Sequence, residues 1–203
     1  MVHISDGVLS GEVLAAGWLV TVVALALTLR RLRAEEIPKL SLTTAAFFVA
    51  SLVHVPFGPT SVHLIMNGLV GVILGPLAFI SVFIGLVLQA FLFGHGGITV
   101  IGVNAMNMGL SALAAYALFR MSKMKNKVQV GVLGFLAGGL AVALAVILTA
   151  LVLFLAGEEF TAVAIALLIA HIPIIIIEAI IVGSIVAFLL RIKPEMLKLE
   201  VSG

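Results

Sequence analysis

The stretch FTAVAIALLIAHIPIIIIEAIIVGSIVAFLL, residues 160–190, indicates the fold class of this chain. It contains one carboxylate, Glu178, and no lysine or arginine. A continuous helix of this length would be about 46 Å long, which exceeds the roughly 30 Å hydrocarbon core of a bilayer. We therefore predict a membrane-spanning helix that is interrupted near Pro173, because proline removes a helical hydrogen bond.

The composition of the whole chain predicts the same class. Of its 203 residues, 63% are hydrophobic and 10% are charged, and the mean hydropathy is +1.36. Charged residues make up roughly a quarter of a soluble domain, and a soluble domain of this size could not bury so much apolar surface. The apolar content excludes intrinsic disorder, and the lack of cysteine excludes a disulfide scaffold. The sequence predicts an all-α integral membrane protein.

We expect a single transmembrane domain over residues 1–203, with a polar N-terminal loop at 1–11 followed by seven transmembrane helices. The predicted helices are 12–29, 40–54, 61–74, 77–93, 100–119, 128–156 and 160–190. Glycine and proline mark the connections between several of them, as in the segments 56–60 and 75–76.

The basic residues give the predicted helices a direction. All eleven lysine and arginine residues lie in the segments 30–39, 120–127 and 191–198. With the N-terminus outside and the C-terminus in the cytoplasm, all three segments are cytoplasmic, as the positive-inside rule requires, whereas six helices would leave one of them outside. Residues 1–11 lack the basic region of a cleavable signal peptide. We predict a multi-pass protein of the cell membrane whose net charge of +2 reflects topology and not a nucleic-acid partner.

The histidines fall on the opposite side from the basic residues. His3, His54, His63, His95 and His171 all lie in the outer half of this arrangement. Imidazole without thiolate suits zinc, copper, iron or nickel, and a terminal amine, a backbone amide and a nearby histidine ring together favour square-planar Ni(II) or Cu(II). A histidine in a turn can equally be an ordinary polar residue at the membrane interface. The residues alone thus indicate an outer-face metal or cation transporter.

Three motifs in order resemble the CbiM/NikM family, the substrate-capturing membrane subunits of energy-coupling-factor transporters for cobalt and nickel. HISDGVLS at 3–10 resembles the family's N-terminal motif M-H-I-x-[DE]-G-x-L. PTSVHL at 59–64, followed by NGL at 67–69, resembles the second motif. QAFLFGHGGIT at 89–99, followed by GVN at 102–104, resembles the third.

The resemblance implies that the N-terminal loop inserts into the helix bundle from outside and holds a transported Ni²⁺ or Co²⁺ ion. The implied ligands are the terminal amine, the backbone nitrogen and ring of His3, and the ring of His63, while His95 and Asn104 orient the ligands and the loop. The implied partners are a transmembrane coupling subunit, cytosolic ATP-binding subunits and a small accessory membrane subunit. Because the chain contains no G-x-x-x-x-G-K-[ST] motif, we predict a transporter subunit without its own ATPase site and not an enzyme.

The N-terminus departs from the family in one residue, because this chain begins Met1-Val2-His3 where the family begins Met-His. If Met1 is removed after synthesis, the amine of Val2 restores the family spacing and becomes a ligand. If Met1 is retained, its amine, two amides and the His3 ring supply four nitrogens without His63. A third alternative is that Val2 is an engineered insertion that disrupts the site.

Two further features have a functional and a structural interpretation. Ala46 and Ala50 form a small-xxx-small pair that either packs within the protein or docks the coupling subunit, as the alanine face of such capture subunits does. Glu178 lies two helical turns from His171, so an alternative function is proton-coupled secondary transport of a metal or other cation by these two residues. An intramembrane metalloenzyme is disfavoured, because the chain contains no H-E-x-x-H motif.

Overall fold

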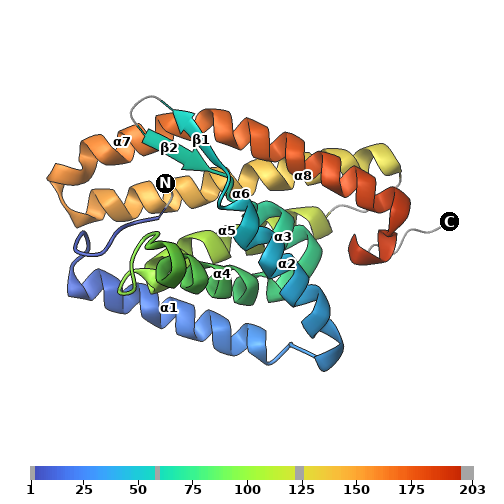
Figure 1. Ribbon diagram of the computed structural model, residues 1–203, viewed down its shortest axis with the longest axis horizontal. Helices are drawn as coiled ribbons and strands as arrows, with labels where there is room; N and C mark the ends of the chain where they lie inside the picture. Colours follow the sequence, from blue (N-terminus) through green and yellow to red (C-terminus); the bar gives the residue numbers. More distant parts are fainter. Residues whose placement is uncertain (1–2, 58–59, 122–125, 198–203) are drawn as a thin grey trace.

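The structure, a computed structural model, describes residues 3–57, 60–121 and 126–197. Its helices lie roughly along one long axis and form a bundle (Figure 1). They are α1 (Gly11–Leu29), α2 (Ile37–Ala50), α3 (Asn67–Leu74), α4 (Ala78–Phe93), α5 (Ile101–Met121), α6 (Lys127–Ala156), α7 (Thr161–Ala170) and α8 (Ile172–Ile192). Short 3₁₀ segments at 34–36, 75–77, 158–160 and 194–197 connect or follow them. The strands β1 (His54–Phe57) and β2 (Thr60–His63) pair antiparallel, with His54 opposite His63.

Five segments of the described chain are long and apolar enough to cross a membrane: Gly11–Leu29, Asn67–Phe93, Ile101–Met121, Lys127–Ala156 and Glu158–Ile192. The two ends of the bundle differ in character (Figure 1). One end carries the N-terminal loop, the α4–α5 loop and the α6–α7 turn, and the other carries the α1–α2 connection and the end of α8. The helix ends that border the three basic segments share the second end.

The helices α1, α5 and α6 lie within two residues of their predicted bounds, and the long last segment is interrupted at His171, with Pro173 in the first turn of α8. The predictions around the hairpin are wrong. The helix predicted over 40–54 ends at Ala50, and the helix predicted over 61–74 begins only at Asn67, because residues 54–57 and 60–63 form strands. Pro56 cannot donate a helical hydrogen bond, and Val55 and Val62, whose β-branched residue type favours strands, are partners in the backbone register of the hairpin.

The short helix α3 is buried in the centre of the bundle, where every one of its residues is inaccessible. Two glycines allow this position. A Cβ atom on Gly71 would lie 2.1 Å from the carbonyl oxygen of Ala112 on α5, and one on Gly68 would lie 2.7 Å from the Cα of Gly138 on α6. The N-terminus of α3 therefore lies inside the protein, directly after the strand that ends at His63.

Candidate metal site at the N-terminal loop

Three histidine rings from distant segments stack on one another. His3 from the N-terminal loop and His63 from the end of β2 have ring centroids 5.1 Å apart, at an interplanar angle of 12°. His95, from the loop after α4, also stacks on His63, with ring centroids 6.3 Å apart at 6°. His3 and His63 are buried, with exposed fractions of 8% and 2%. The structure thus brings together three of the residues that the sequence singles out.

Asn104 on α5 fastens the loop next to His3. Its side-chain oxygen accepts a hydrogen bond from the Ile4 backbone nitrogen at 3.0 Å, and its side-chain nitrogen donates to the Ile4 carbonyl at 3.0 Å. The carboxamide therefore pairs with the main chain as a neighbouring strand would, and it satisfies both backbone groups of a buried residue. This contact places the adjacent His3 ring inside the bundle.

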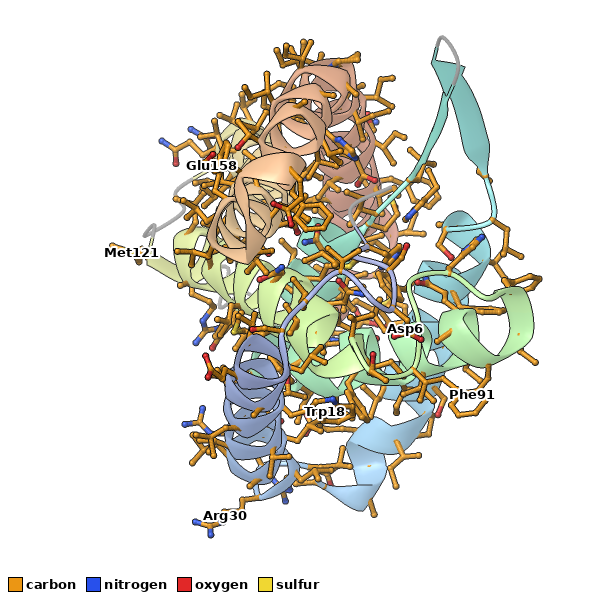
Figure 2. All side chains as sticks on the ribbon, turned by 90° about the vertical axis from the view of Figure 1, so that its left-hand side faces the viewer. Asp6, Trp18, Arg30, Phe91, Met121 and Glu158 are labelled. Carbon is orange, nitrogen blue, oxygen red and sulfur yellow. The ribbon has the colours of Figure 1, made fainter. Side chains whose placement is uncertain are left out.

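Asp6 makes a second attachment, which the sequence analysis missed. Its carboxylate accepts hydrogen bonds from the backbone nitrogens of Ile98 and Thr99, both at 3.0 Å, and from the Thr99 hydroxyl. Figure 2 shows Asp6 against the loop that follows α4. The approach requires glycine at position 97, because a Cβ atom there would lie 2.2 Å from the Asp6 carboxyl carbon. The N-terminal motif has an acidic residue at the position of Asp6, and this feature of the sequence could have pointed to the contact.

We expect Asp6→Asn to release the N-terminal loop, and Trp18 can report it. Trp18 is the chain's single tryptophan, and its indole nitrogen donates to the Thr99 carbonyl at 2.9 Å. The Thr99 hydroxyl is the largest cause of a pKa of Asp6 below its usual value. The attachment is therefore present above the usual aspartate pKa of about 3.9 and is lost only as the pH falls through the lower folded-state value.

The measurement is Trp18 fluorescence between pH 7 and pH 3. The wild-type emission should stay constant down to about pH 4 and then change, whereas Asp6→Asn should show the changed emission throughout. Glu12→Gln, which removes an exposed carboxylate in the first turn of α1, is the matched control and should behave as the wild type. An Asp6→Asn emission equal to that of the wild type at pH 7 would contradict the attachment.

The hydrogen bond of His63 decides which of its nitrogens can bind a metal. Nδ1 lies 2.8 Å from the Leu64 carbonyl oxygen. Because a carbonyl only accepts, Nδ1 carries the proton in the neutral ring, and Nε2 carries the lone pair. A metal-binding histidine commonly donates its other N–H to a backbone carbonyl in this way, which fixes both the tautomer and the ring orientation.

His3 is also suited to binding a metal. Burial, followed by the charge on neighbouring His63, holds the pKa of the His3 ring well below its usual range. The ring is therefore neutral at physiological pH, as a ligand must be. Both His3 ring nitrogens are buried and have no hydrogen-bond partner among the described residues. A buried polar atom without a partner is costly, and a bound ion would remove that cost.

Side chains alone do not complete a metal site. Within residues 3–57, 60–121 and 126–197, no group of three histidine, cysteine, aspartate or glutamate side chains is arranged to hold an ion. The predicted ligands Met1 and Val2 lie outside the described residues.

The remaining predicted residues lie apart from the histidine stack or serve other contacts. The His171 ring contacts the Leu167 carbonyl of the preceding turn, and Glu178 binds the backbone nitrogens of Ile65 and Met66. Ala46 is exposed on α2, whereas Ala50 is partly buried against the core. Ala46 lines an apolar groove of about 200 Å³ between α2, α3 and α8.

The chain is similar to known transport proteins. A family profile described as "Cobalt uptake substrate-specific transmembrane region", CbiM, matches residues 3–196. A Haemophilus influenzae protein named as a metal transport protein is 39% identical over 201 residues, covering 96% of each chain. A fused nickel transport protein named NikMN, from Archaeoglobus fulgidus, is 30% identical over 149 residues, covering 71% of this chain and 50% of the relative.

A solved structure also resembles the whole fold. The crystal structure of a truncated transition metal transporter superposes with a TM-score of 0.73 at 28% identity, covering 93% of this chain and 98% of the other. The family match extends over residues that include His3, His63 and Asn104. The chain belongs to the CbiM family of cobalt and nickel transport components, and it is a multi-pass protein of the cell membrane.

Proposed function

We propose that this protein captures a divalent transition metal ion on the outer side of the membrane and passes it to an ATP-driven importer of the energy-coupling-factor type. The observation that supports this most directly is the stack of His3 on His63, because it joins the N-terminal loop to the interior of the bundle through two buried rings. The loop is attached on both sides of this point, by Asn104 and by Asp6. The neutral state of the buried His3 ring and the fixed tautomer of His63 suit metal ligation.

The proposed ligands are four nitrogens: the amine of Val2 after removal of Met1, the backbone nitrogen and ring of His3, and Nε2 of His63. His95 and Asn104 hold the ligands in place, His95 by stacking on His63 and Asn104 through its bonds to Ile4. Four nitrogens in one plane favour Ni²⁺ over Co²⁺. We therefore propose nickel as the preferred ion and cobalt as a weaker substrate.

Calorimetric titration of the purified protein with Ni²⁺ and with Co²⁺ tests this function, together with the intact mass that identifies the mature N-terminus. We expect one ion per chain and tighter binding of nickel. A protein that begins at Val2 and binds neither ion would contradict the function. Tighter binding of cobalt would contradict the square-planar ligand set alone.

The opposite end of the bundle is the proposed site of energy coupling. It borders the basic segments that the positive-inside rule places in the cytoplasm, where the ATP-binding subunits would lie.

The groove beside Ala46 is apolar and is flanked by Phe47, Met66 and Leu189, so it suits a helix of the coupling subunit within the bilayer. We propose that α2 docks the coupling subunit there.

Ala46→Leu is expected to block this docking. The larger side chain would overfill the groove, and overpacking typically costs about 1–3 kcal/mol, or about 5- to 150-fold in affinity. Co-purification of a tagged coupling subunit from membranes measures assembly, and nickel titration measures the metal site, which should be unaffected. Ala45→Leu is the matched control, since Ala45 is exposed on the same helix but does not line the groove. Equal loss of partner in both variants would contradict the proposed face.

A further inference from the structure

Glu178 is a carboxylate that is buried inside a membrane-spanning segment of the described chain. It lies on α8 inside a membrane-spanning segment and has an exposed fraction of 0%. A carboxylate at such a depth is costly unless its environment compensates it. Here both oxygens accept hydrogen bonds from Met66 nitrogen, at 3.0 and 3.1 Å, and one also accepts from Ile65 nitrogen.

These bonds cap a helix that begins inside the protein. The first N–H groups of a helix, counted from its N-cap, have no partner within it, and the N-cap of α3 is Met66, which is buried. A carboxylate at this end satisfies donors just ahead of the helix and opposes the positive end of its dipole. The position of α3 between α5 and α6 therefore depends on a side chain contributed by α8, more than a hundred residues away.

The same bonds hold the backbone in an unusual conformation. Met66 has a φ of 55°, which makes it the one non-glycine residue of the described chain with positive φ. The left-handed conformation is unfavourable for a residue with a Cβ atom and persists only where its surroundings impose it. The carboxylate supplies that constraint at the nitrogen of Met66 itself.

The constrained segment leads directly to His63. The Leu64 carbonyl is the group that fixes the His63 ring, and the nitrogens of the next two residues are the groups bound by Glu178. The segment 63–66 thus carries the imidazole at its first residue and the contacts with the Glu178 carboxylate at its last two residues. Any change in the Glu178 contact would displace the Leu64 carbonyl and, with it, the direction of the Nε2 lone pair.

We propose that Glu178 is a positioning residue for the metal site, which holds residues 64–66 so that the His63 ring faces His3. The inference rests on the proposed role of His63 as a ligand. It gives the buried carboxylate a role other than proton transfer with His171, because the described contacts of the two side chains go to different backbone groups: those of Glu178 to the start of α3, those of His171 to its own helix.

The first experiment compares nickel affinity and the ligand-field absorption of the nickel-loaded protein. Glu178→Gln should weaken nickel binding by about tenfold or more, because one of the two acceptor oxygens becomes an NH₂ donor and at least one bond from Ile65 or Met66 is lost. Its absorption should shift toward that of His63→Ala. The matched control is Glu159→Gln, the same chemical change at an exposed site in the α6–α7 turn, and it should bind as the wild type. Equal affinity and spectra for the two glutamine variants would overturn the proposal.

A second comparison separates positioning from a general loss of stability. In the Glu178→Gln background, Met66→Gly and Met66→Ala both remove the methionine side chain, but only glycine adopts the left-handed conformation without strain. The glycine variant should bind nickel at least about threefold more tightly than the alanine variant. Glycine avoids the strain of the left-handed conformation, and the free energy saved corresponds to a factor of about this size. Equal affinities would overturn the proposal.

If Glu178→Gln does not fold, Glu178→Asp is the variant that tests the proposal. It keeps the charge but shortens the side chain by one methylene, so it should also weaken nickel binding if reach to residues 65 and 66 is what matters. Wild-type affinity in Glu178→Asp would overturn the positioning role. A wild-type protein that binds no nickel would instead contradict the proposed function, so the two failures are distinguishable.

Discussion

His63→Ala is expected to weaken nickel binding more than a hundredfold. Loss of a residue that merely supports a ligand typically costs about 10–100-fold in metal affinity, and His63 is proposed as a ligand itself. Its Nε2 is the nitrogen left with a lone pair once Nδ1 donates to the Leu64 carbonyl. Its ring also packs against His3, so its removal takes away both a ligand and the surface on which the loop rests.

Competition with a chelator of known affinity measures this effect in purified protein. His54→Ala is the control, because His54 is the histidine opposite His63 in the hairpin register and is not a proposed ligand. Asn104→Ala should fall between the two, with a loss of about tenfold, since it removes the bonds to Ile4 that position His3 but removes no ligand. If His63→Ala binds nickel as tightly as the wild type, the ligand set is wrong.

The apolar length of the chain was enough to predict most helices, but not the hairpin. A helix and a short strand are both compatible with apolar residues such as those in 61–66, and periodicity cannot separate them over so few positions. The pairing of His54 with His63 and the burial of α3 decide the matter through contacts that only the folded chain makes. Gly68 and Gly71 signal close packing, but not the helices they pack against.

The candidate site, like the fold, could be predicted only in part from the sequence. The motifs point to His3, His63, His95 and Asn104, and the structure brings all four to one place. The contacts of Asp6 and Glu178 depend on backbone N–H groups, which every residue but proline carries and no sequence pattern marks. The spacing of Glu178 and His171 predicts a shared helix face, yet each side chain bonds elsewhere. Long-range hydrogen bonds to the main chain are therefore the part of the site that could not be predicted from the sequence.

Extension of the N-terminus is expected to abolish tight nickel binding as completely as loss of His63. The proposed site uses the terminal amine of Val2, and a tag of several residues converts that amine into an amide and leaves no free amine near His3. A protein made with a removable N-terminal tag provides its own control. Before cleavage, nickel should bind more than about a hundredfold more weakly than after cleavage at Val2, because ligation at two of the four positions is disturbed.

The same design distinguishes the two possible N-termini. A protein that begins at Val2 needs His63 as its fourth nitrogen, so His63→Ala should weaken its nickel binding strongly. A protein that begins at Met1 has an amine, two amides and the His3 ring, which complete a square-planar set without His63. In that protein His63→Ala should change nickel affinity little. A strong His63 dependence in both forms would mean that the loop adapts to the extra residue, and nickel affinity that is unchanged by tag cleavage would exclude the terminal amine as a ligand.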